Sequence, residues 1–258
     1  MQQNNDKHGG IDKMIQDLHS HTYYSFCGAD RPEAVVEAAI EAGVELFGIT
    51  DHNYGVGLAR YDVFVSKSDD LNSSYGGTLK RYFDHINLIK EKYADKINIL
   101  RGIEIATVNQ LKYALPEGVD VSFFDYCLIE NLDNPDSIAN GDLFAFAKRC
   151  GCKCGVAHTD MFGFIKSRGY DPLEYFTRMA EEGIFWEMNV NYDSIHKYRV
   201  HKYMLEFFEN EEQQDIIRRS GVRISVGFDG HRCREYLGDR VREYCEKLTE
   251  LGIPLAFE

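Results

Sequence analysis

Short apolar runs alternate along the chain with longer segments in which apolar residues recur at helical spacing. Seven of these runs are bounded by polar or glycine-containing turns and are predicted to be strands, at residues 14–21, 44–52, 97–105, 123–131, 152–159, 184–191 and 223–231. The segment 31–44, "RPEAVVEAAIEAGV", is predicted to be a helix because proline stands in its first turn and Gly43 closes it. Strand–helix alternation of this kind predicts a parallel sheet covered by helices.

Further helices are predicted at residues 78–93, 141–151, 171–183, 200–221 and near 238–252. Residues 57–77 fit neither period, and we expect them to form a long loop over the mouth of the fold. Seven strand–helix units in 258 residues indicate a single α/β barrel, with residues 1–12 as a polar tail and residues 13–258 as the domain.

Ionisable residues stand at or near the end of every predicted strand. Because the carboxyl ends of parallel barrel strands meet at one face, these side chains are expected to converge there. Residues two apart in a strand share a face, so His19 should point with His21, and Asp229 with His231. Asp17 lies on the first of these faces and is placed to orient an imidazole. The strand-end residues are His19, His21, Asp51, His52, Glu104, Glu130, His158, Glu187, Asn189, Asp229 and His231.

Such crowding of imidazoles and carboxylates predicts a metal centre. Neighbouring carboxylates raise each other's pKa, and buried histidines without partners are costly, whereas divalent cations relieve both problems. Mixed nitrogen and oxygen ligands suit Zn²⁺, Mn²⁺ or Fe²⁺. A simple turn would account for Asp51–His52 and core packing for His158, but such separate roles would have to hold at every strand end at once.

Some residues are set aside at this point. Arg101 alternates with Glu104 and is expected to point away from the site. The "CGCKCG" stretch lacks the paired C-x₂-C spacing of zinc sites, so we interpret Cys152 and Cys154 as packing residues of the fifth strand. His196 and His201 border a predicted helix and are not included in the metal site.

Composition narrows the class of protein. The formal net charge of −13 disfavours binding to nucleic acid backbones or anionic membranes, although a metal-lined cleft still admits an anionic substrate. No apolar run approaches the roughly 20 residues of a membrane helix, and the polar first ten residues lack a signal-peptide core. The odd count of seven cysteines suits reduced thiols, so a cytoplasmic protein is expected.

Five motifs, in order and across nearly the whole chain, resemble those of the PHP (polymerase and histidinol phosphatase) superfamily. They are "DLHSHT" (17–22), "GITDHN" (48–53), "RGIEI" (101–105), "VAHTD" (156–160) and "GFDGH" (227–231). The resemblance implies a distorted (β/α)7 TIM-like barrel, with parallel strands, an outer ring of helices and two or three divalent metal ions at its mouth.

The resemblance also implies a ligand set. His19, His21, Glu104 and Asp229 would surround one metal, Glu104 would bridge to a second held by His158, and His52 and His231 would contribute to a third. Two positions depart from the family pattern. Cys27 stands where the family often has histidine or aspartate, and it is either a ligand of the third metal or a packed thiol. Glu130 lies near the usual histidine of the fourth strand, and it either replaces that ligand or leaves the second metal site weakened.

The predicted activity is hydrolysis of a phosphate ester by a metal-activated water, with a small phosphorylated substrate. Catalytic roles are predicted for His52, His231 and Asp229, and a phosphate contact for Arg232, with Arg168 and Lys166 as weaker candidates. Two alternatives stay open, an amidohydrolase-type enzyme and a metal-binding domain without turnover. The sequence predicts neither the leaving group nor the oligomeric state.

Overall fold

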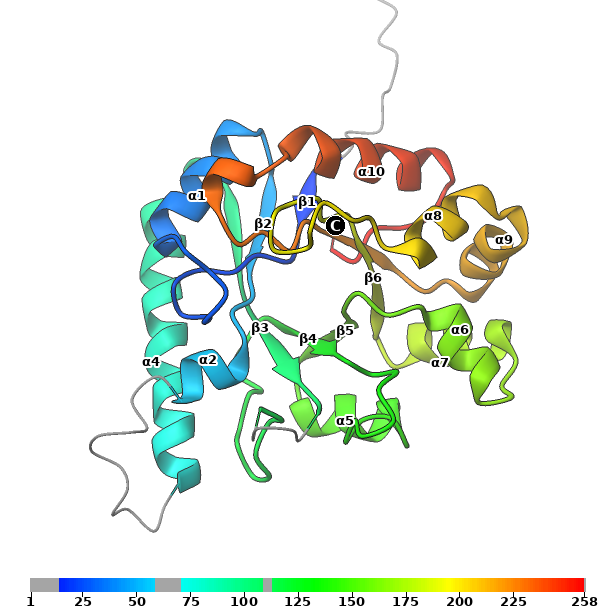
Figure 1. Ribbon diagram of the computed structural model, residues 1–258, viewed down its shortest axis with the longest axis horizontal. Coiled ribbons are helices and arrows are strands. Elements are labelled where there is room, and N and C mark those ends of the chain that lie inside the picture. The colour runs from blue at the N-terminus through cyan, green and yellow to red at the C-terminus, as the bar shows by residue number, and fades with distance from the viewer. Residues whose placement is uncertain (1–13, 59–70, 109–112, 258) are drawn as a thin grey trace, which may run out of the picture.

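Seven parallel strands form the centre of the computed structural model, which describes residues 14–58, 71–108 and 113–257 (Figure 1). Each strand pairs with its neighbour in chain order, and helices surround them. The strands are β1 (Gln16–Asp17), β2 (Leu46–Ile49), β3 (Asn98–Ala106), β4 (Tyr126–Glu130), β5 (Lys153–Val156), β6 (Phe185–Asn189) and β7 (Ile224–Gly227).

The first and last strands approach each other and nearly close the barrel. Backbone hydrogen bonds run from Leu18 N to Val226 O at 2.9 Å and from Asp229 N to His19 O at 2.7 Å. The predicted strand at 14–21 is regular only at Gln16–Asp17, because from Leu18 onward the backbone bonds to β7 and the loops beside it. The predicted parallel α/β barrel is therefore confirmed.

The helices follow the predicted alternation with three differences. The predicted helix 200–221 is two helices, because the Asn210 side chain accepts from Gln213 N and starts a new one. The described parts of the predicted loop 57–77 are helical, and residues 59–70 lie outside the described residues. Helix α6 was not predicted. The helices are α1 (Pro32–Glu41), α2 (Asn53–Leu58), α4 (Leu71–Lys92), α5 (Leu143–Cys150), α6 (Met161–Ser167), α7 (Pro172–Glu181), α8 (Lys202–Glu209), α9 (Glu211–Ser220) and α10 (Gly238–Glu250).

Side chains fill the barrel interior, so the fold has a packed core rather than a pore. Tyr126 is fully buried there, and its hydroxyl donates to Leu18 O at 2.6 Å. Gly48 makes room for this ring, since a Cβ at that position would lie 1.8 Å from the Tyr126 hydroxyl oxygen. The interior cluster consists of Leu18, Leu46, Tyr126, Leu128, Ala157, Phe185 and Ala256.

The end of the chain covers the amino-terminal end of the barrel. Ile224, the first residue of β7, exchanges backbone hydrogen bonds with this segment, accepting from Ala256 N and donating to Pro254 O. Gln16, at the start of β1, donates to Phe257 O. The opposite end, where the strands terminate, is therefore the end at which a site can form.

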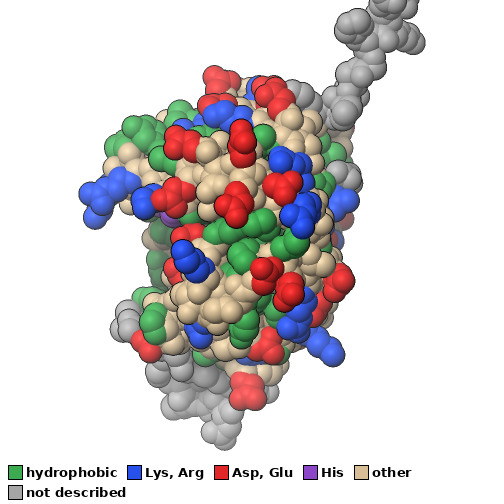
Figure 2. Space-filling view, turned by 90° about the vertical axis from the view of Figure 1, so that its right-hand side faces the viewer, with side chains coloured by type: hydrophobic (Ala, Val, Ile, Leu, Met, Phe, Trp, Pro, Cys, Tyr) green, Lys and Arg blue, Asp and Glu red, His purple; other side chains and the backbone are tan. Residues whose placement is uncertain are grey.

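The surface charge is mixed on the side of the molecule where α6 to α9 lie. Figure 2 shows acidic and basic side chains interspersed there, so the net charge of −13 does not produce a single-sign field on this face. Among the described residues, none of the helices combines the length and the apolar character that crossing a bilayer requires. The predicted tail, residues 1–12, lies outside the described residues, and the domain boundary at 13 stays a prediction.

Candidate metal centre

Four side chains from three strand ends form the centre of the site. His19 Nε2 lies 3.2 Å from His21 Nε2, 3.4 Å from Glu104 Oε1 and 3.5 Å from Asp229 Oδ1. His21 Nε2 lies 3.0 Å from the same Asp229 oxygen. Ligand atoms about 2.1 Å from one metal ion lie roughly 3.0–3.4 Å apart, so these four donors are spaced as a ligand set would be.

Glu104 connects this group to two further histidines. Its Oε1 atom lies 3.0 Å from His158 Nε2, and its Oε2 atom lies 2.8 Å from His52 Nδ1. Glu130 also reaches the group, with Oε1 at 3.6 Å from His52 Nδ1. Burial, together with the nearby Glu104 charge, raises the pKa of Glu130 to about 7. The structure thus brings both carboxylates into one cluster with His52 and His158.

Cys27 lies inside the cluster. Its sulfur groups with donor atoms of His21 and His52, all within 4.8 Å of one another. Burial opposes ionisation of this thiol, but hydrogen bonds with His231 and His52 lower its pKa below the usual value. The structure therefore brings the Cys27 thiol next to the two imidazoles.

The structure adds residues that the sequence-based site omitted. His196 Nε2 lies 3.1 Å from Asp229 Oδ2, and Asp193 Oδ1 lies 2.7 Å from His196 Nδ1. Asp193, His196 and His231 also form a group with the spacing of metal ligands. His196, which the sequence analysis left out of the metal site because it borders a predicted helix, therefore lies at the cluster. Asp193 and His196 both lie in the loop between β6 and α8, so extending the strand-end rule to this loop would have found them.

Glu187, rather than Asp17, orients an imidazole. Glu187 Oε1 lies 2.7 Å from His19 Nδ1, which leaves Nε2 of the same ring facing the cluster. The expected hydrogen bond of Asp17 with an imidazole is absent from the described residues. Its Oδ1 instead accepts from the backbone nitrogens of His19 and Phe228, because its side chain turns toward the β1–β7 junction.

Several residues of the cluster are held in strained or tightly constrained segments. Asp229 and His158 have positive φ values of 56° and 25°, which non-glycine residues adopt at a cost. His158 N donates to Glu187 Oε2 at 2.8 Å, and this bond helps to hold the backbone in place. Asp51 acts on the ligand-bearing loop: it accepts four hydrogen bonds from Thr22 and Ser25 and so fixes the segment that carries Cys27.

Unpaired donor atoms test whether metal ions fit the site. Within the described part of the chain, four buried side-chain atoms of the cluster have no hydrogen-bond partner: His52 Nδ1, Glu104 Oε2, Asp193 Oδ2 and His231 Nδ1. The first two approach each other at 2.8 Å, but outside hydrogen-bond geometry. Buried polar atoms are normally satisfied, and nitrogen and carboxylate oxygen are the atoms that divalent cations bind. The residues present therefore fit divalent metal ions.

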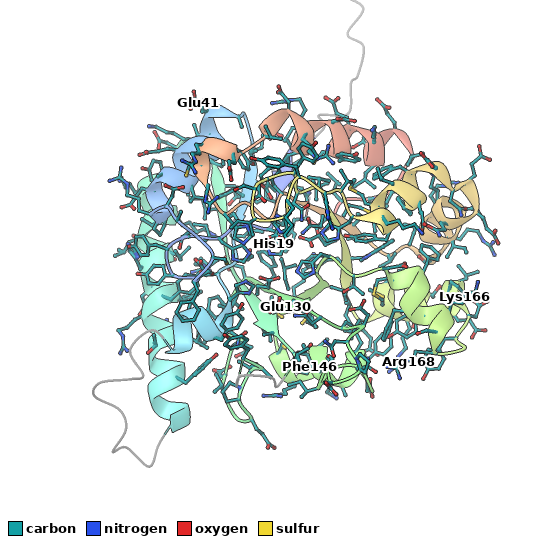
Figure 3. The ribbon with its side chains drawn as sticks, in the orientation of Figure 1. His19, Glu41, Glu130, Phe146, Lys166 and Arg168 are labelled. Carbon is teal, nitrogen blue, oxygen red and sulfur yellow. The ribbon has the colours of Figure 1, made fainter. Side chains whose placement is uncertain are left out.

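The three predicted phosphate contacts lie in different places. Arg232 adjoins His231, and its Nη1 donates to the hydroxyl of Ser194, the residue after Asp193. Lys166 and Arg168 stand at the end of α6, at the outer edge of the barrel and away from His19 and Glu130 (Figure 3). Only Arg232 is thus brought near the cluster.

A nearly closed parallel α/β barrel with a histidine–carboxylate cluster at its mouth defines a class of metal-binding barrel proteins. The sequence model of the PHP domain matches residues 17–251, and the chain belongs to the PHP domain family. The predicted family is therefore confirmed.

One curated relative and one solved structure illustrate what this chain is similar to. A histidinol-phosphatase of Lactococcus lactis subsp. lactis (strain IL1403) is 28% identical over 112 residues, which are 43% of this chain and 37% of that protein. The matched region thus spans little more than a third of that relative. The crystal structure of histidinol phosphate phosphatase from Lactococcus lactis subsp. lactis Il1403, complexed with Zn, L-histidinol and phosphate, superposes with a TM-score of 0.53 at 18% identity, covering 93% of this chain and 95% of that one. This second likeness supports the fold.

Proton uptake by the metal-free site predicts how pH affects stability. Burial would lower the pKa values of His158, His196 and His231, but facing carboxylates raise them to about 9, 9 and 10. Groups with raised folded-state pKa values stabilise the protein fully below the unfolded value near 6.5 and lose that contribution as pH rises to about 9–10. The chelated protein should therefore show a falling Tm between pH 7 and pH 10.

Thermal unfolding with and without chelator checks this expectation. In the metal-loaded protein the cation replaces these protons, so its Tm should fall less over the same pH range. Equal slopes for the two forms would contradict the assignment of these histidines to a metal-binding cluster.

Proposed function

We propose that the chain is a metal-dependent phosphoesterase that hydrolyses a small phosphorylated substrate, in the manner of a histidinol-phosphatase. The observation that carries the proposal is the sharing of Glu104 and Asp229 between neighbouring histidine groups at the barrel mouth. Such sharing spaces several cations closely enough to hold one phosphate group between them. Membership in the PHP domain family supports the same reaction class.

Two or three divalent ions, zinc, manganese or iron, would occupy the site. His19, His21, Glu104 and Asp229 would hold the first ion, His158 with Glu104 and Glu130 the second, and Cys27, His52 and His231 the third. When bound, the ions would supply an activated water nucleophile and neutralise charge on the phosphoryl oxygens. The mixed nitrogen, oxygen and sulfur donors support zinc among the three metals.

The chain's own residues would complete the reaction. His52 or His231, whichever is not engaged with a metal ion, would donate a proton to the leaving alkoxide. Asp229 would orient His21 and His196, which it contacts at 3.0 Å and 3.1 Å. Arg232 would bind a phosphate oxygen, because Ser194 holds its guanidinium next to the Asp193 loop.

Aromatic rings beside the cluster favour a planar leaving group. The Tyr54 ring stacks on His52 with centroids 4.7 Å apart and on Tyr113 at 4.3 Å, and Phe26 lies at 6.3 Å on the same ring. Stacked rings of this kind bind flat, apolar or heteroaromatic groups. An imidazole-bearing alcohol such as histidinol is consistent with this wall. The proposal places the enzyme in the cytoplasm, where its seven free cysteines would stay reduced.

A phosphate-release screen tests the function. Histidinol phosphate and a panel of sugar and nucleotide phosphates would be incubated with the metal-loaded protein, and metal content would be measured on the same preparation. Release of phosphate that stops after chelation and returns on adding zinc or manganese is the expected result. Turnover of amides or lactones without phosphate release, or metal binding without any turnover, would overturn the proposal.

Replacing Cys27 by serine is expected to lower metal content by up to one ion per chain and to reduce kcat/KM about 10- to 100-fold, because the thiolate is a stronger ligand for zinc than a hydroxyl. Elemental analysis and initial rates would measure both effects. Cys245→Ser provides the matched control, since this buried cysteine of α10 contacts only a backbone oxygen, that of Gln16, among the sulfur hydrogen bonds described. Unchanged metal content in Cys27→Ser would exclude the thiol as a ligand.

A further inference from the structure

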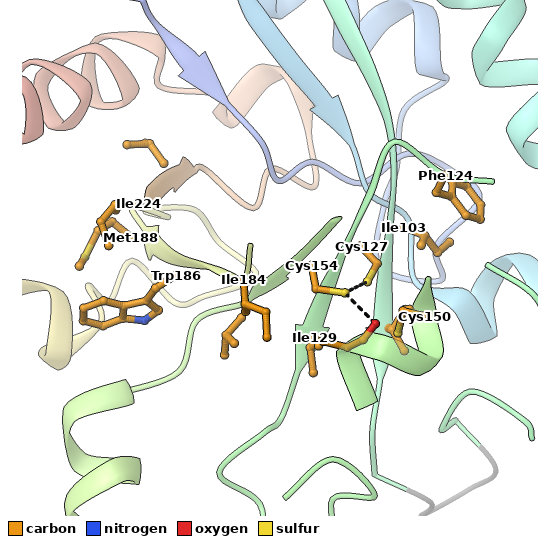
Figure 4. Packing of buried hydrophobic residues seen from close by; sticks show 14 of the residues in the cluster. Ile103, Phe124, Cys127, Ile129, Cys150, Cys154, Ile184, Trp186, Met188 and Ile224 are labelled. Carbon is orange, nitrogen blue, oxygen red and sulfur yellow. Dashed lines mark hydrogen bonds between the residues drawn. The ribbon is translucent and has the colours of Figure 1, made fainter. Parts of the chain in front are cut away.

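Four cysteines meet on the outer side of the barrel sheet, away from the strand ends that carry the metal centre. Cys127 comes from β4, Cys154 from β5 and Cys150 from the last turn of α5 (Figure 4). Cys152 lies in the turn between α5 and β5. The sulfurs of Cys127 and Cys154 lie 3.3 Å apart, and those of Cys127, Cys150 and Cys154 all lie within 4.8 Å of one another. Cys152 lies beside them: its backbone oxygen accepts from Cys154 Sγ at 3.3 Å, and hydrogen bonds with Cys127 and Cys154 lower the pKa of its thiol.

The local chain path explains how four thiols converge. Cys127 and Cys154 are directly opposite each other in the parallel pairing of β4 and β5. Gly151 ends α5 in the left-handed conformation, with a φ of 71°, which glycine adopts without strain. The reversal brings Cys150 and Cys152 back over the two strands. The sequence analysis interpreted Cys152 and Cys154 as packing residues and did not consider Cys127 or Cys150. Cys127 comes close to Cys154 only through the pairing of β4 with β5.

The thiols form hydrogen bonds at this site, Cys127 with Cys154, and Cys154 with the backbone oxygens of Ala147 and Cys152. Hydrogen bonds from Cys127 and Cys154 lower the pKa of Cys150 to about 5 and that of Cys152 to about 4. The donating Cys127 thiol has its pKa raised well above the usual value. These lowered pKa values favour thiolates at Cys150 and Cys152, and a thiolate in a largely buried pocket is stabilised by a bound cation. The Arg149 guanidinium also lowers the pKa of Cys150.

We propose that Cys127, Cys150, Cys152 and Cys154 bind one structural zinc ion, distinct from the metal ions at the barrel mouth. Four thiolates at about 2.3 Å from a tetrahedral zinc lie about 3.8 Å apart. This spacing falls between the 3.3 Å of the Cys127–Cys154 pair and the 4.8 Å limit for the sulfurs of Cys127, Cys150 and Cys154. Polynuclear iron–sulfur clusters need wider spacing between their cysteines, because inorganic sulfides and several irons lie between them. Binding releases the protons of the thiols that are still neutral and transfers no electrons.

The position of this site gives it a structural role. Cys127 lies three residues before Glu130 in β4, and Cys154 lies four residues before His158, so the ion would fix the strands that lead to both. It would also tie the end of α5 to the sheet. Both Cys127 and Cys154 pack in the core layer between sheet and helices, where water has little access and a closed, four-ligand site is favoured.

Cobalt substitution tests the proposal in a background from which the other thiolate site has been removed. The double variant Cys27→Ser, Asp229→Asn lacks a thiol at the barrel mouth and has weakened metal binding there. Purified under reducing conditions and loaded with Co²⁺, it should bind one tightly held ion with sulfur-to-cobalt charge-transfer absorption. Absence of that absorption would overturn the proposal, and this measurement changes no residue of the four-cysteine group.

Zinc release provides the second measurement. In Cys27→Ser protein, an organic mercurial in the presence of a colorimetric zinc indicator should release one zinc per chain beyond the zinc that mild chelation removes. Cys150→Ser, Cys152→Ser should lose that equivalent and lower the Tm, whereas Cys245→Ser should keep it. Retention of full zinc content by the first variant, or a Cys127–Cys154 disulfide found by mass spectrometry of freshly purified protein, would contradict the assignment.

Discussion

Asp229→Asn is expected to lower kcat/KM for phosphoester hydrolysis on the order of 10³-fold and to remove most of the metal bound at the barrel mouth. Asp229 is buried, and its two oxygens contact His21 at 3.0 Å and His196 at 3.1 Å. Asparagine keeps the size of the side chain but removes the charge that attracts a cation. It also tolerates the positive φ of 56° at this position, so the fold should be retained.

Matched measurements separate lost chemistry from lost structure. Asp215→Asn makes the same change at an exposed ion pair with Arg219 and should alter neither rate nor metal content measurably. His21→Ala should reproduce the loss seen with Asp229→Asn, because burial holds the pKa of His21 at about 3 and so provides a neutral imidazole ready to bind a cation. Phosphatase activity that survives in either site variant after chelation would show that the proposed mechanism is wrong.

Glu187→Gln is expected to weaken metal binding and kcat/KM about 10- to 100-fold, although Glu187 is a positioning residue and not one of the proposed ligands. Glu187 Oε1 lies 2.7 Å from His19 Nδ1, and Oε2 accepts from His158 N at 2.8 Å. The charge fixes the His19 tautomer that presents Nε2 to the metal. Glutamine keeps the shape but can direct its NH₂ group at the same nitrogen, which disfavours that tautomer.

Metal titration distinguishes this positioning role from general destabilisation. The variant should recover much of its rate at high metal concentration, because the ligands themselves are intact, whereas Asp229→Asn should not. Glu182→Gln, on the exposed end of α7, is the control for the substitution. If added metal fails to restore Glu187→Gln while its Tm matches that of the wild type, the charge has a more direct part in the reaction.

Local pattern was sufficient for the architecture. Apolar runs and helical periodicity placed seven strands in the right order, because strand pairing in this barrel follows chain order and needs no long-range rearrangement. The bounds of two elements were predicted less accurately. β1 is short because its continuation bonds to β7, and the helix 200–221 divides at Asn210, where a side-chain cap outweighs the continuing periodicity.

The strand-end rule also predicted most of the cluster. His19, His21, Glu104, Asp229 and their neighbours converge because the carboxyl ends of parallel strands meet by geometry, whatever the loops do. Arg101 points away from the cluster as expected, and its guanidinium pairs with Asp125 at 2.6 Å. Lys166 and Arg168 lie at the edge because α6 carries them outward, and no rule of spacing specifies the direction of a helix after a loop.

The sequence by itself determined the strand order, the family and the residues at the strand ends, since all of these follow from short-range periodicity and motif spacing. Only the tertiary structure decided that His196 and Asp193 join the cluster, that Glu187 rather than Asp17 orients His19, and that four cysteines meet behind β4 and β5. Those contacts join segments whose approach depends on barrel closure and on the path of individual loops. Their energies come from side-chain pairs distant in sequence, which leave no periodic signal along the chain.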